Sequence, residues 1–586
     1  MQHFAVEKRG MVMQAPELSA LALASERCLE PRRGANEQIQ NLAVALGISR
    51  TLADVFVRRE ILDAERVRRF LAPKLADLTI PDQMADRGAL AERLVRAVRN
   101  RERIVVYGDY DCDGITSAAI LTDILRSLGG HVVPHLASRF DGGYGVSLPA
   151  VQRILASKPS VLVTCDCGSS DHASLKVVSE AGVDVLVIDH HLVPDAPLPA
   201  KAFINPHRPE CGFPYKGLAS CGLALSIGAA LRTELDPKLD LRRYLDLVAI
   251  GTIADVAPLD GDNRPLVRAG LDMLRRAERP GVKALLEYAK IDLNAPISGE
   301  DVAFRVAPRI NAPGRLGAPD PAFDLLLAKN LDTARSLAAR VEQITDQRKE
   351  LQREMEQASI ELIEEAGWDK EPAIVVGEES WNHGIVGIVA GRLTDRYNVP
   401  VIVVGFEGQL GRGSVRGPAG SRLYDALSKA SAHLDRFGGH QAAAGVTLQR
   451  ENLEQFREDF LAACAEGTAS PRGEVRQDPA QVVRLDPSDD PFQVVRDFER
   501  LEPCGEANPA PKLRIEAKLV SAREVTGGHL KLELQLPSGR RIGAFGVEQG
   551  AQATQLGEQV VAVGRHKRDT YRGGEAVEMR LDQVRG

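Results

Sequence analysis

Val185-Leu186-Val187-Ile188-Asp189-His190-His191 is the most informative segment of the chain: an apolar run that ends in an acidic residue and two histidines. Such a run is typical of a strand that is buried on both faces of a sheet. Two earlier runs end in the same way: residues 104–107 lead into Gly-Asp-Tyr-Asp-Cys-Asp-Gly, and residues 161–164 lead into Cys-Asp-Cys-Gly. Because parallel α/β sheets bind ligands at the carboxyl ends of their strands, we expect these polar residues to meet at one point.

Several carboxylates and an imidazole at one point predict a metal site, since close carboxylates repel unless a cation lies between them. The segment from Asp109 to Gly114 also matches the start of an EF-hand calcium loop. That loop requires a bidentate glutamate at its twelfth position, where this chain has Ile120, and β-like residues precede it instead of a helix. A single histidine would more often be a buried, hydrogen-bonded ring. Two in a row after a strand-end aspartate favour ligands.

The composition is that of an ordinary globular protein. Of its residues, 44% are hydrophobic and 26% are charged, and the net charge is −7. The length of 586 residues predicts three or four domains. The eight cysteines include no CxxC pair, so neither a disulfide framework nor a zinc ribbon is predicted. No apolar run reaches the ~18–20 residues that span a bilayer, and the first residues lack a signal-peptide core. We therefore expect a cytoplasmic protein without a membrane segment.

The pattern along the chain predicts an α/β protein with five parts. Residues 1–85 read as an N-terminal extension with small helices, and residues 86–330 alternate between strand and helix patterns, as in a doubly wound parallel sheet. Residues 331–367 form a long, charged stretch that predicts a connecting helix. Residues 368–468 predict a second α/β domain with glycine-rich turns. The last part, residues 469–586, has short alternating strands, a local excess of basic residues and the pattern of a small β-barrel.

Four motifs in this order resemble those of the DHH family of phosphoesterases: DYDCDG (109–114), TCDCGSS (164–170), VIDHH (187–191) and GTIADVAP (251–258). Further segments resemble the RecJ branch of that family, which consists of single-strand-specific 5′→3′ exonucleases. They are RVAPRINAPGRLG (305–317), HGIVGIVAGRL (383–393), GRGSVRG (411–417), GGHQAAAG (438–445) and EPCGEANP (502–509). The resemblance implies a DHH domain, a DHH-associated substrate-binding domain and a C-terminal OB-like barrel.

The resemblance also implies roles for single residues. The expected metal ligands are Asp109, Asp111, Asp113, Asp166, His190 and Asp255, although Asp109 could equally be a partner of a ligand. Two ions are expected, Mn²⁺ or in its place Mg²⁺, because mixed imidazole and carboxylate ligands suit them. Asp113, Asp166 and His191 would take part in catalysis, with His191 near the scissile phosphate as a proton donor or electrostatic stabiliser. The residues expected to hold the strand are Arg309, Ser414, Arg416 and His440.

The activity implied by the resemblance is 5′→3′ degradation of single-stranded DNA to 5′-mononucleotides in recombination and repair. A monomer is expected, with a single-strand-binding protein and a RecQ-type helicase as partners. Two alternatives remain open at this point. One is a nanoRNase or cyclic-dinucleotide phosphodiesterase, which would not need the extra N-terminal region and the barrel. The other is a non-catalytic scaffold on single-stranded DNA, which would not need an intact ligand set.

Overall fold

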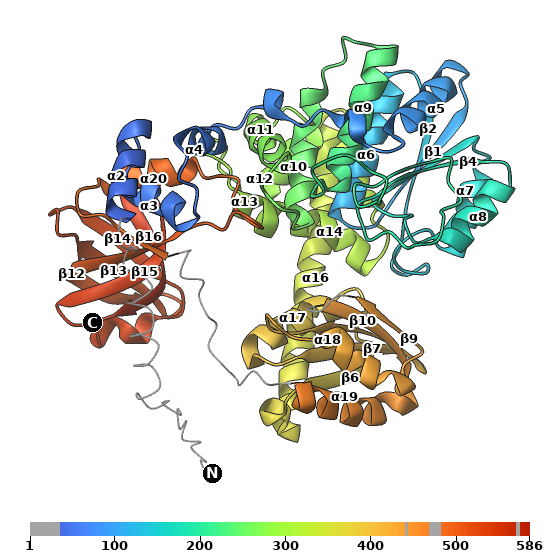
Figure 1. The fold of residues 1–586 in the computed structure, drawn as a ribbon. Helices are drawn as coiled ribbons and strands as arrows, with labels where there is room; N and C mark the ends of the chain where they lie inside the picture. Colours follow the sequence, from blue (N-terminus) through green and yellow to red (C-terminus); the bar gives the residue numbers. More distant parts are fainter. Residues whose placement is uncertain (1–34, 440–442, 468–481, 570–572, 574) are drawn as a thin grey trace. The chain divides into compact units, whose positions relative to one another are not determined.

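The computed structural model describes residues 35–439, 443–467, 482–569, 573 and 575–586, and these residues divide into two compact units (Figure 1). One unit is built from Leu75–Glu474 together with Gly505–Asn508. The other unites described residues from the two ends of the chain, up to Lys74 and from Val475 on. Among the described residues, none of the helices has both the length and the low polarity that crossing a bilayer demands.

The first sheet is parallel throughout and has the order β2-β1-β3-β4-β5. The strands predicted at residues 104–107, 161–164 and 185–188 are present as β1, β3 and β4, so the doubly wound sheet is confirmed. The direction of winding reverses between β1 and β3, and sheets of this type bind ligands at that reversal, outside the carboxyl ends of the strands. The bounds are Arg103–Gly108 for β1, His131–Leu136 for β2, Val161–Cys165 for β3, Asp184–Ile188 for β4 and Ala202–Ile204 for β5.

The turn from β1 into α6 (Cys112–Ser127) is set by Asp111 and Gly114. The Asp111 carboxylate caps the helix by accepting a hydrogen bond from the Gly114 amide at 3.0 Å. A Cβ on Gly114 would lie 2.6 Å from the backbone nitrogen of Asp109, so only glycine lets the loop fold back this closely. The turn therefore holds the aspartates of the first motif beside the end of β1.

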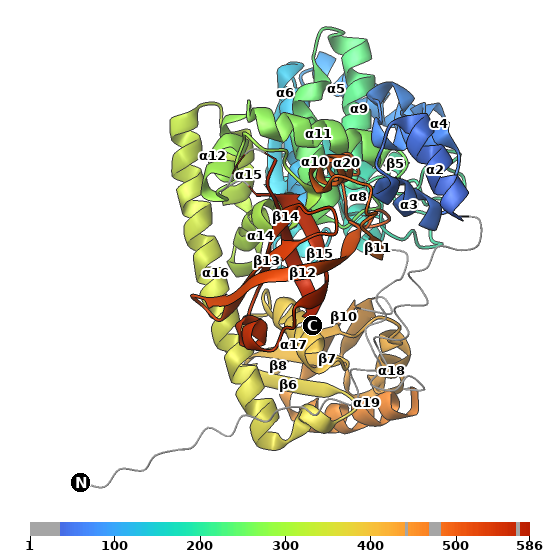
Figure 2. The ribbon, with the colours of Figure 1, turned by 90° about the vertical axis from the view of Figure 1, so that its left-hand side faces the viewer.

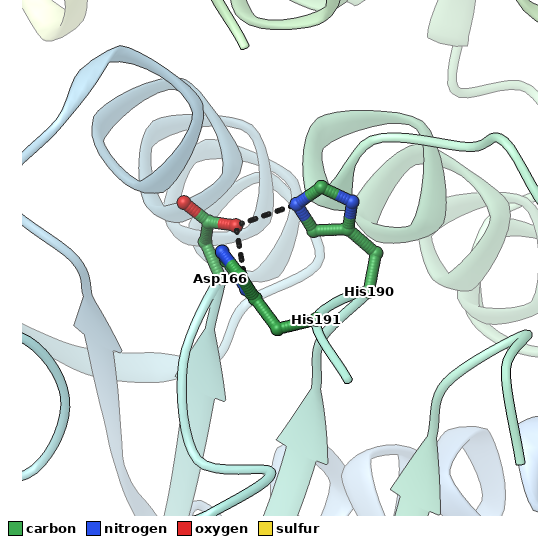
Figure 3. A group of neighbouring side chains, drawn as sticks. All are labelled: Asp166, His190 and His191. Atoms are coloured by element: carbon green, nitrogen blue, oxygen red, sulfur yellow. Dashed lines mark ion pairs between the residues drawn. The ribbon is translucent and has the colours of Figure 1, made fainter. Parts of the chain in front are cut away.

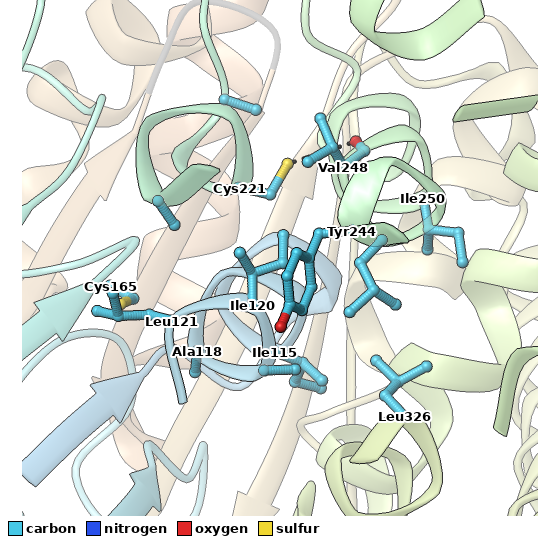
Figure 4. Close-up of a cluster of buried hydrophobic side chains, with 14 of the residues drawn as sticks. Ile115, Ala118, Ile120, Leu121, Cys165, Cys221, Tyr244, Val248, Ile250 and Leu326 are labelled. Carbon is cyan, nitrogen blue, oxygen red and sulfur yellow. Dashed lines mark hydrogen bonds between the residues drawn. The ribbon is translucent and has the colours of Figure 1, made fainter. Parts of the chain in front are cut away.

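Helix α6 lies in the core of the first domain, where it packs against α9 (Ser220–Leu235) and α10 (Leu245–Ala254). Figure 4 shows Ile115, Ile120 and Tyr244 among the apolar side chains of this core. Nearly every residue of α6 is buried, in keeping with a helix whose apolar residues surround it on all sides. The helix that carries the first-motif aspartates is therefore fixed by packing on all its faces. Other helices of this domain are α5 (Arg87–Arg99), α7 (Leu148–Ala156), α8 (His172–Glu180), α11 (Asn263–Arg276) and α12 (Pro280–Tyr288).

The predicted connecting helix is α16, which runs without a break over Leu331–Ala366. It packs against α12, α14 (Ala307–Leu316) and α15 (Asp320–Leu327) along one part and against β6 and α17 (Val386–Tyr397) along another (Figure 2). The second sheet has the order β6-β7-β8-β10-β9, and only β6 and β7 are parallel. Its strands are β6 (Ile374–Glu379), β7 (Val401–Glu407), β8 (Leu410–Arg416), β9 (Arg436–Gly439) and β10 (Ala443–Gln449), with α18 (Leu423–Lys429) and α19 (Leu453–Gly467) beside them.

The unit formed by the two ends of the chain contains the predicted barrel. Its sheet has the order β11-β12-β13-β14-β16-β15, and a further pairing of β12 with β15 closes it. The N-terminal helices α2 (Ala35–Leu46), α3 (Arg50–Arg58) and α4 (Ala64–Leu71) share one hydrophobic core with this barrel, which the sequence did not indicate. The barrel elements are β11 (Val482–Arg484), α20 (Pro491–Glu499), β12 (Lys512–Val525), β13 (His529–Gln535), β14 (Arg541–Gly546), β15 (Gln559–Arg568) and β16 (Val577–Arg585).

Two aspartates, one just before α20 and one within it, join the N-terminal helices to the barrel. Asp489 accepts hydrogen bonds from the Thr51 amide and hydroxyl, both at 2.7 Å, and from the Arg50 amide at 3.1 Å. Asp497 is buried and accepts one from the Ser49 amide at 2.7 Å. The amino end of α3 is thus capped by residues more than four hundred positions away in sequence.

We expect Asp489→Ala to lower the free energy of unfolding of this unit by about 1–2 kcal/mol, the usual effect of losing a helix cap. The measurement is urea unfolding of the full chain, followed by the fluorescence of a label on the barrel. Glu558→Ala, which removes an exposed partner of Lys518, serves as the control and should leave the midpoint unchanged. Equal midpoints for Asp489→Ala and the wild-type chain would show that the cap does not hold the two ends together.

Candidate metal centre and basic pocket

Four elements bring carboxylates to the reversal point of the first sheet. Asp109 follows β1, Asp113 lies in the first turn of α6, Asp166 follows β3, and Asp255 is the C-cap residue of α10. Asp166 adopts a left-handed φ of 65°, which aspartate and asparagine tolerate better than most residues. The sequence predicted this convergence, and the structure brings these side chains together.

His190 lies at the centre of the carboxylates. Its Nε2 atom is 3.3 Å from Asp166 Oδ1, 3.6 Å from Asp255 Oδ2 and 3.9 Å from Asp113 Oδ2. The His191 ring lies beside that of His190, with ring centroids 4.6 Å apart, and its Nδ1 atom is 3.9 Å from the same Oδ1 atom (Figure 3). One carboxylate oxygen of Asp166 therefore faces both rings.

The side chains fall into three overlapping groups whose ligand atoms lie within 4.8 Å of one another. Asp166 belongs to two of the groups and His190 to two, so neighbouring groups share a member. Overlap of this kind suits two adjacent ions that share a ligand. The groups are Asp109 with Asp111 and Asp166, Asp113 with His190 and Asp255, and Asp166 with His190 and His191.

The chemistry of the donor atoms fits divalent cations. Asp109 Oδ1 and His190 Nε2 are buried and make no hydrogen bond. Burial and the charge of Asp111 raise the pKa of Asp109 well above its usual range, and burial and the charge of Asp113 do the same for the pKa of Asp166. Burial with Asp113 and Asp111 raises the pKa of Asp255 to about 8. Buried carboxylates that resist ionisation in the absence of a counter-charge are what a cation site requires.

Asp189, the first residue of the Asp-His-His triplet, is an orienting residue for His191. It is fully buried and accepts hydrogen bonds from the Ser169 amide at 2.9 Å and from His191 Nδ1 at 2.8 Å. Burial would raise the pKa of Asp189, but these hydrogen bonds and the charge of His191 lower it to about 2. Burial would lower the pKa of His191, but Asp189 raises it to about 9. The Tyr144 hydroxyl also lies 2.9 Å from His191 Nδ1.

Ser414 and Arg416, both expected to hold the strand, lie together at the end of β8. The Arg416 Nη1 atom donates to Ser414 Oγ and to the Val415 carbonyl, both at 2.8 Å. A Cβ on Gly387 would lie 3.1 Å from Ser414 Oγ and 3.2 Å from Arg416 Nη2, so these groups stand against the first turn of α17. Helix amino ends and arginines are the common ligands of phosphate groups.

Three basic residues that we did not predict as site residues join this pair. Burial and the charge of Arg139 lower the pKa of Arg416, and burial with Arg139 lowers the pKa of Arg315 to about 10. The guanidinium of Arg139 lies 4.0 Å above the ring of Tyr110, between Asp109 and Asp111 in sequence. His383 has a buried Nε2 atom without a hydrogen bond, and its ring packs on Phe140. The name basic pocket is used below for this cluster of side chains, Arg139, Arg315, His383, Ser414 and Arg416.

Two of the expected strand-binding residues lie elsewhere or cannot be placed. The structure does not bring Arg309 to the basic pocket, because its side chain forms a two-bond ion pair with Glu342 at 2.6 and 2.9 Å. Arg315, six residues further along α14, lies in the pocket instead. His440 lies outside the described residues.

We expect Mg²⁺ binding at pH 7 to release protons. In the metal-free fold the raised pKa of Asp255, together with those of Asp109 and Asp166, keeps protons on carboxyl groups between about pH 4 and 8. A cation displaces these protons because it binds the ionised form. Calorimetric titration in two buffers with different heats of protonation measures the number released. Release should be smaller in Asp255→Asn. Identical heats in the two buffers at pH 7 would contradict the raised pKa values.

Comparison with known proteins identifies the domains of this chain and its relatives. Residues 103–252 match the family model of the DHH family N-terminal domain, residues 370–466 the DHHA1 domain, and residues 483–583 the RecJ OB domain. The single-stranded-DNA-specific exonuclease RecJ of Bacillus subtilis is 36% identical over 88% of this chain, which spans 65% of that relative's length. The RecJ of Escherichia coli is 33% identical over 84% of this chain and 89% of its own length.

Solved structures extend the match to the fold. The crystal structure of Thermus thermophilus RecJ in complex with Mn²⁺ superposes with a TM-score of 0.79 at 31% identity, over 94% of this chain and 78% of that one. The Mg²⁺ complex of the same protein gives a TM-score of 0.72 at 29% identity, over 94% of this chain and 77% of that one. The matched domains, the relatives and the acidic cluster agree, and the chain belongs to the RecJ family of DHH proteins.

Proposed function

We propose that this chain is a metal-dependent exonuclease that removes mononucleotides from the 5′ end of single-stranded DNA. The observation that carries the proposal is that the basic pocket adjoins the acidic cluster. Tyr110, between Asp109 and Asp111, carries the guanidinium of Arg139 on its ring. A 5′-phosphate bound in the pocket would place the next phosphodiester at the carboxylates. This spacing would fix the polarity of cleavage without any contact to the bases.

The residues of the site suit hydrolysis of the bond between phosphorus and the leaving 3′ oxygen. Asp109, Asp111, Asp113, Asp166, His190 and Asp255 would hold two ions, Mn²⁺ or Mg²⁺, that supply an activated water and neutralise charge on the phosphoryl oxygens. Despite burial, Asp189 raises the pKa of His191 to about 9 in the metal-free fold, which favours a protonated ring. Asp189 fixes Nδ1 of that ring, which leaves Nε2 to donate its proton to the leaving 3′ oxygen.

The barrel is of a type that binds single strands, and part of its basic charge is paired with carboxylates inside the barrel. In the segment 565–568, Lys567 is ion-paired with Glu578 at 3.1 Å, and Arg568 is ion-paired with Glu499. Charge from this segment is therefore partly neutralised within the barrel. We propose that the barrel contributes affinity for the strand, in keeping with the match to the RecJ OB domain.

The protein partners, the oligomeric state and the cellular compartment are also proposals. Single strands in cells arise from unwinding and are covered by protein, so a RecQ-type helicase and a single-strand-binding protein are the partners we propose for a monomer in the cytoplasm. The five parts expected from the sequence are proposed as its organisation, with the N-terminal helices and the barrel joined by their shared hydrophobic core. The three ranges matched by family models fall within three of them, residues 86–330, 368–468 and 469–586.

We expect a single strand labelled at the 5′ end to lose its label at once as a mononucleotide in Mn²⁺, whereas a 3′ label should stay on long products. EDTA should abolish the reaction, and a matched blunt duplex should resist it. Gel analysis of the products at early times decides the outcome. Rapid cleavage of di- to pentanucleotides with no action on long strands would instead indicate a small-oligonucleotide phosphodiesterase. Strand binding without cleavage would indicate a scaffold.

We expect Arg416→Ala to weaken the use of 5′-phosphorylated strands by about 10- to 100-fold, since a hydrogen bond to a charged group contributes roughly 1.5–3 kcal/mol. The loss should be much smaller for strands with a 5′-hydroxyl, because these lack the group that Arg416 would bind. Arg392→Ala, on α17 and ion-paired with Glu356, is the matched control and should change neither rate. An equal loss of activity on both substrates would show that Arg416 does not recognise the 5′-phosphate.

A further inference from the structure

The amino end of α9 is capped by a carboxylate of the metal centre. Its N-cap residue is Ala219, which has no side chain able to cap a helix. The Ser220 amide donates instead to Asp113 Oδ2 at 2.7 Å, and the Cys221 amide donates to Asp113 Oδ1 at 3.0 Å. Both oxygens of Asp113 are therefore oriented by the start of α9, where the helix dipole favours negative charge.

Ser220 extends this contact to a second carboxylate. Its hydroxyl donates to Asp166 Oδ1 at 3.0 Å, the same oxygen that lies 3.3 Å from His190 Nε2. Ser220, Asp113 and Asp166 are all buried. One residue of α9 thus holds, through its amide and its hydroxyl, two carboxylates that come from α6 and from the end of β3.

We propose that Ser220 is a positioning residue that fixes Asp113 and Asp166 as a pair and so sets the affinity of the centre for divalent cations. The proposal rests on the metal centre described above, and no motif in the sequence pointed to Ser220. Asp113 and Asp166 repel each other, and donors on both keep their oxygens in place before a cation binds. Without the Ser220 hydroxyl, the buried Asp166 Oδ1 atom would lose a hydrogen-bond donor.

The test variant Ser220→Ala changes one hydrogen bond, the one from the Ser220 hydroxyl to Asp166 Oδ1. Ser220→Ala removes the hydroxyl and keeps the hydrogen bond from the backbone amide of residue 220 to Asp113, so the cap of α9 stays intact. Removing a hydrogen-bond partner of a metal ligand typically costs 10–100-fold in metal affinity. We therefore expect the dissociation constant for Mn²⁺ to rise about 10-fold or more. Saturating Mn²⁺ should largely restore kcat, and KM for single-stranded DNA should not change, because Ser220 is not a residue of the basic pocket.

The experiment is a Mn²⁺ titration of the full chain without DNA, in which the free ion is followed by electron paramagnetic resonance. Ser359→Ala is the control, because Ser359 is also a buried serine in a helix but donates to the Met355 carbonyl at 2.7 Å in α16. It should titrate like the wild-type chain. Because no DNA is present, the result does not depend on whether the chain is a nuclease.

A Ser220→Ala titration that superimposes on the wild-type curve would overturn the proposal. Ser220→Gly provides a second test, since it removes the hydroxyl together with Cβ and keeps the backbone amide, and it should show at least the same loss of affinity. Misfolding of both variants, seen as loss of the cooperative thermal transition, would equally overturn the proposal, because it would assign Ser220 a role in stability instead.

Discussion

Repulsion among buried carboxylates at the end of the first sheet is the constraint on which this molecule depends. Asp109, Asp113 and Asp166 are buried, and Asp255 and His190 complete the group. Within a protein such charges interact far more strongly than in water, and burial favours their neutral forms. The raised pKa values of Asp109, Asp166 and Asp255 express this cost. A divalent cation removes this cost by neutralising the carboxylates, so the ion that serves catalysis also stabilises the folded site.

The fold concentrates this charge by rules that apply to all open parallel sheets. The strand order places the ends of β1 and β3 at the point where winding reverses, and each strand end contributes an aspartate. Surrounding donors then orient these groups: Asp111 caps α6, Asp189 holds His191, and the start of α9 holds Asp113. The basic pocket places positive charge beside the negative cluster, an arrangement suited to a phosphate chain that ends in a monoester.

Much of the centre was predictable, because strand-end residues follow from apolar runs that are visible in sequence. The three first-motif aspartates, Asp166 and the two histidines all follow such runs, whereas Asp255 came from the family motif alone. The basic pocket was less predictable. Arg139 lies in a loop and Arg315 in a helix, and neither position has a periodic pattern. Arg309 and Arg315 are six residues apart, about two thirds of a turn around the helix axis, so the two cannot face the same site.

Contacts between distant segments account for the rest of what the sequence did not reveal. The capping of α3 by Asp489 joins residues 438 positions apart, and the Ser220 contacts with Asp113 and Asp166 span 107 and 54 positions. A hydroxyl or amide in such a contact has no signature in a local sequence window. Its role follows only from three-dimensional position. The chemistry-bearing side chains were therefore foreseen better than the residues that hold them in place.

The role of carboxylate repulsion can be tested by thermal unfolding of Asp166→Asn at pH 8, in EDTA and in Mg²⁺. Asparagine tolerates the left-handed backbone at this position, so the change removes charge without adding strain. If carboxylate repulsion governs the centre, the variant melts at a higher temperature than the wild-type chain in EDTA and gains little from Mg²⁺, whereas the wild-type chain gains markedly. A variant that is less stable in EDTA and still responds fully to Mg²⁺ would contradict the account.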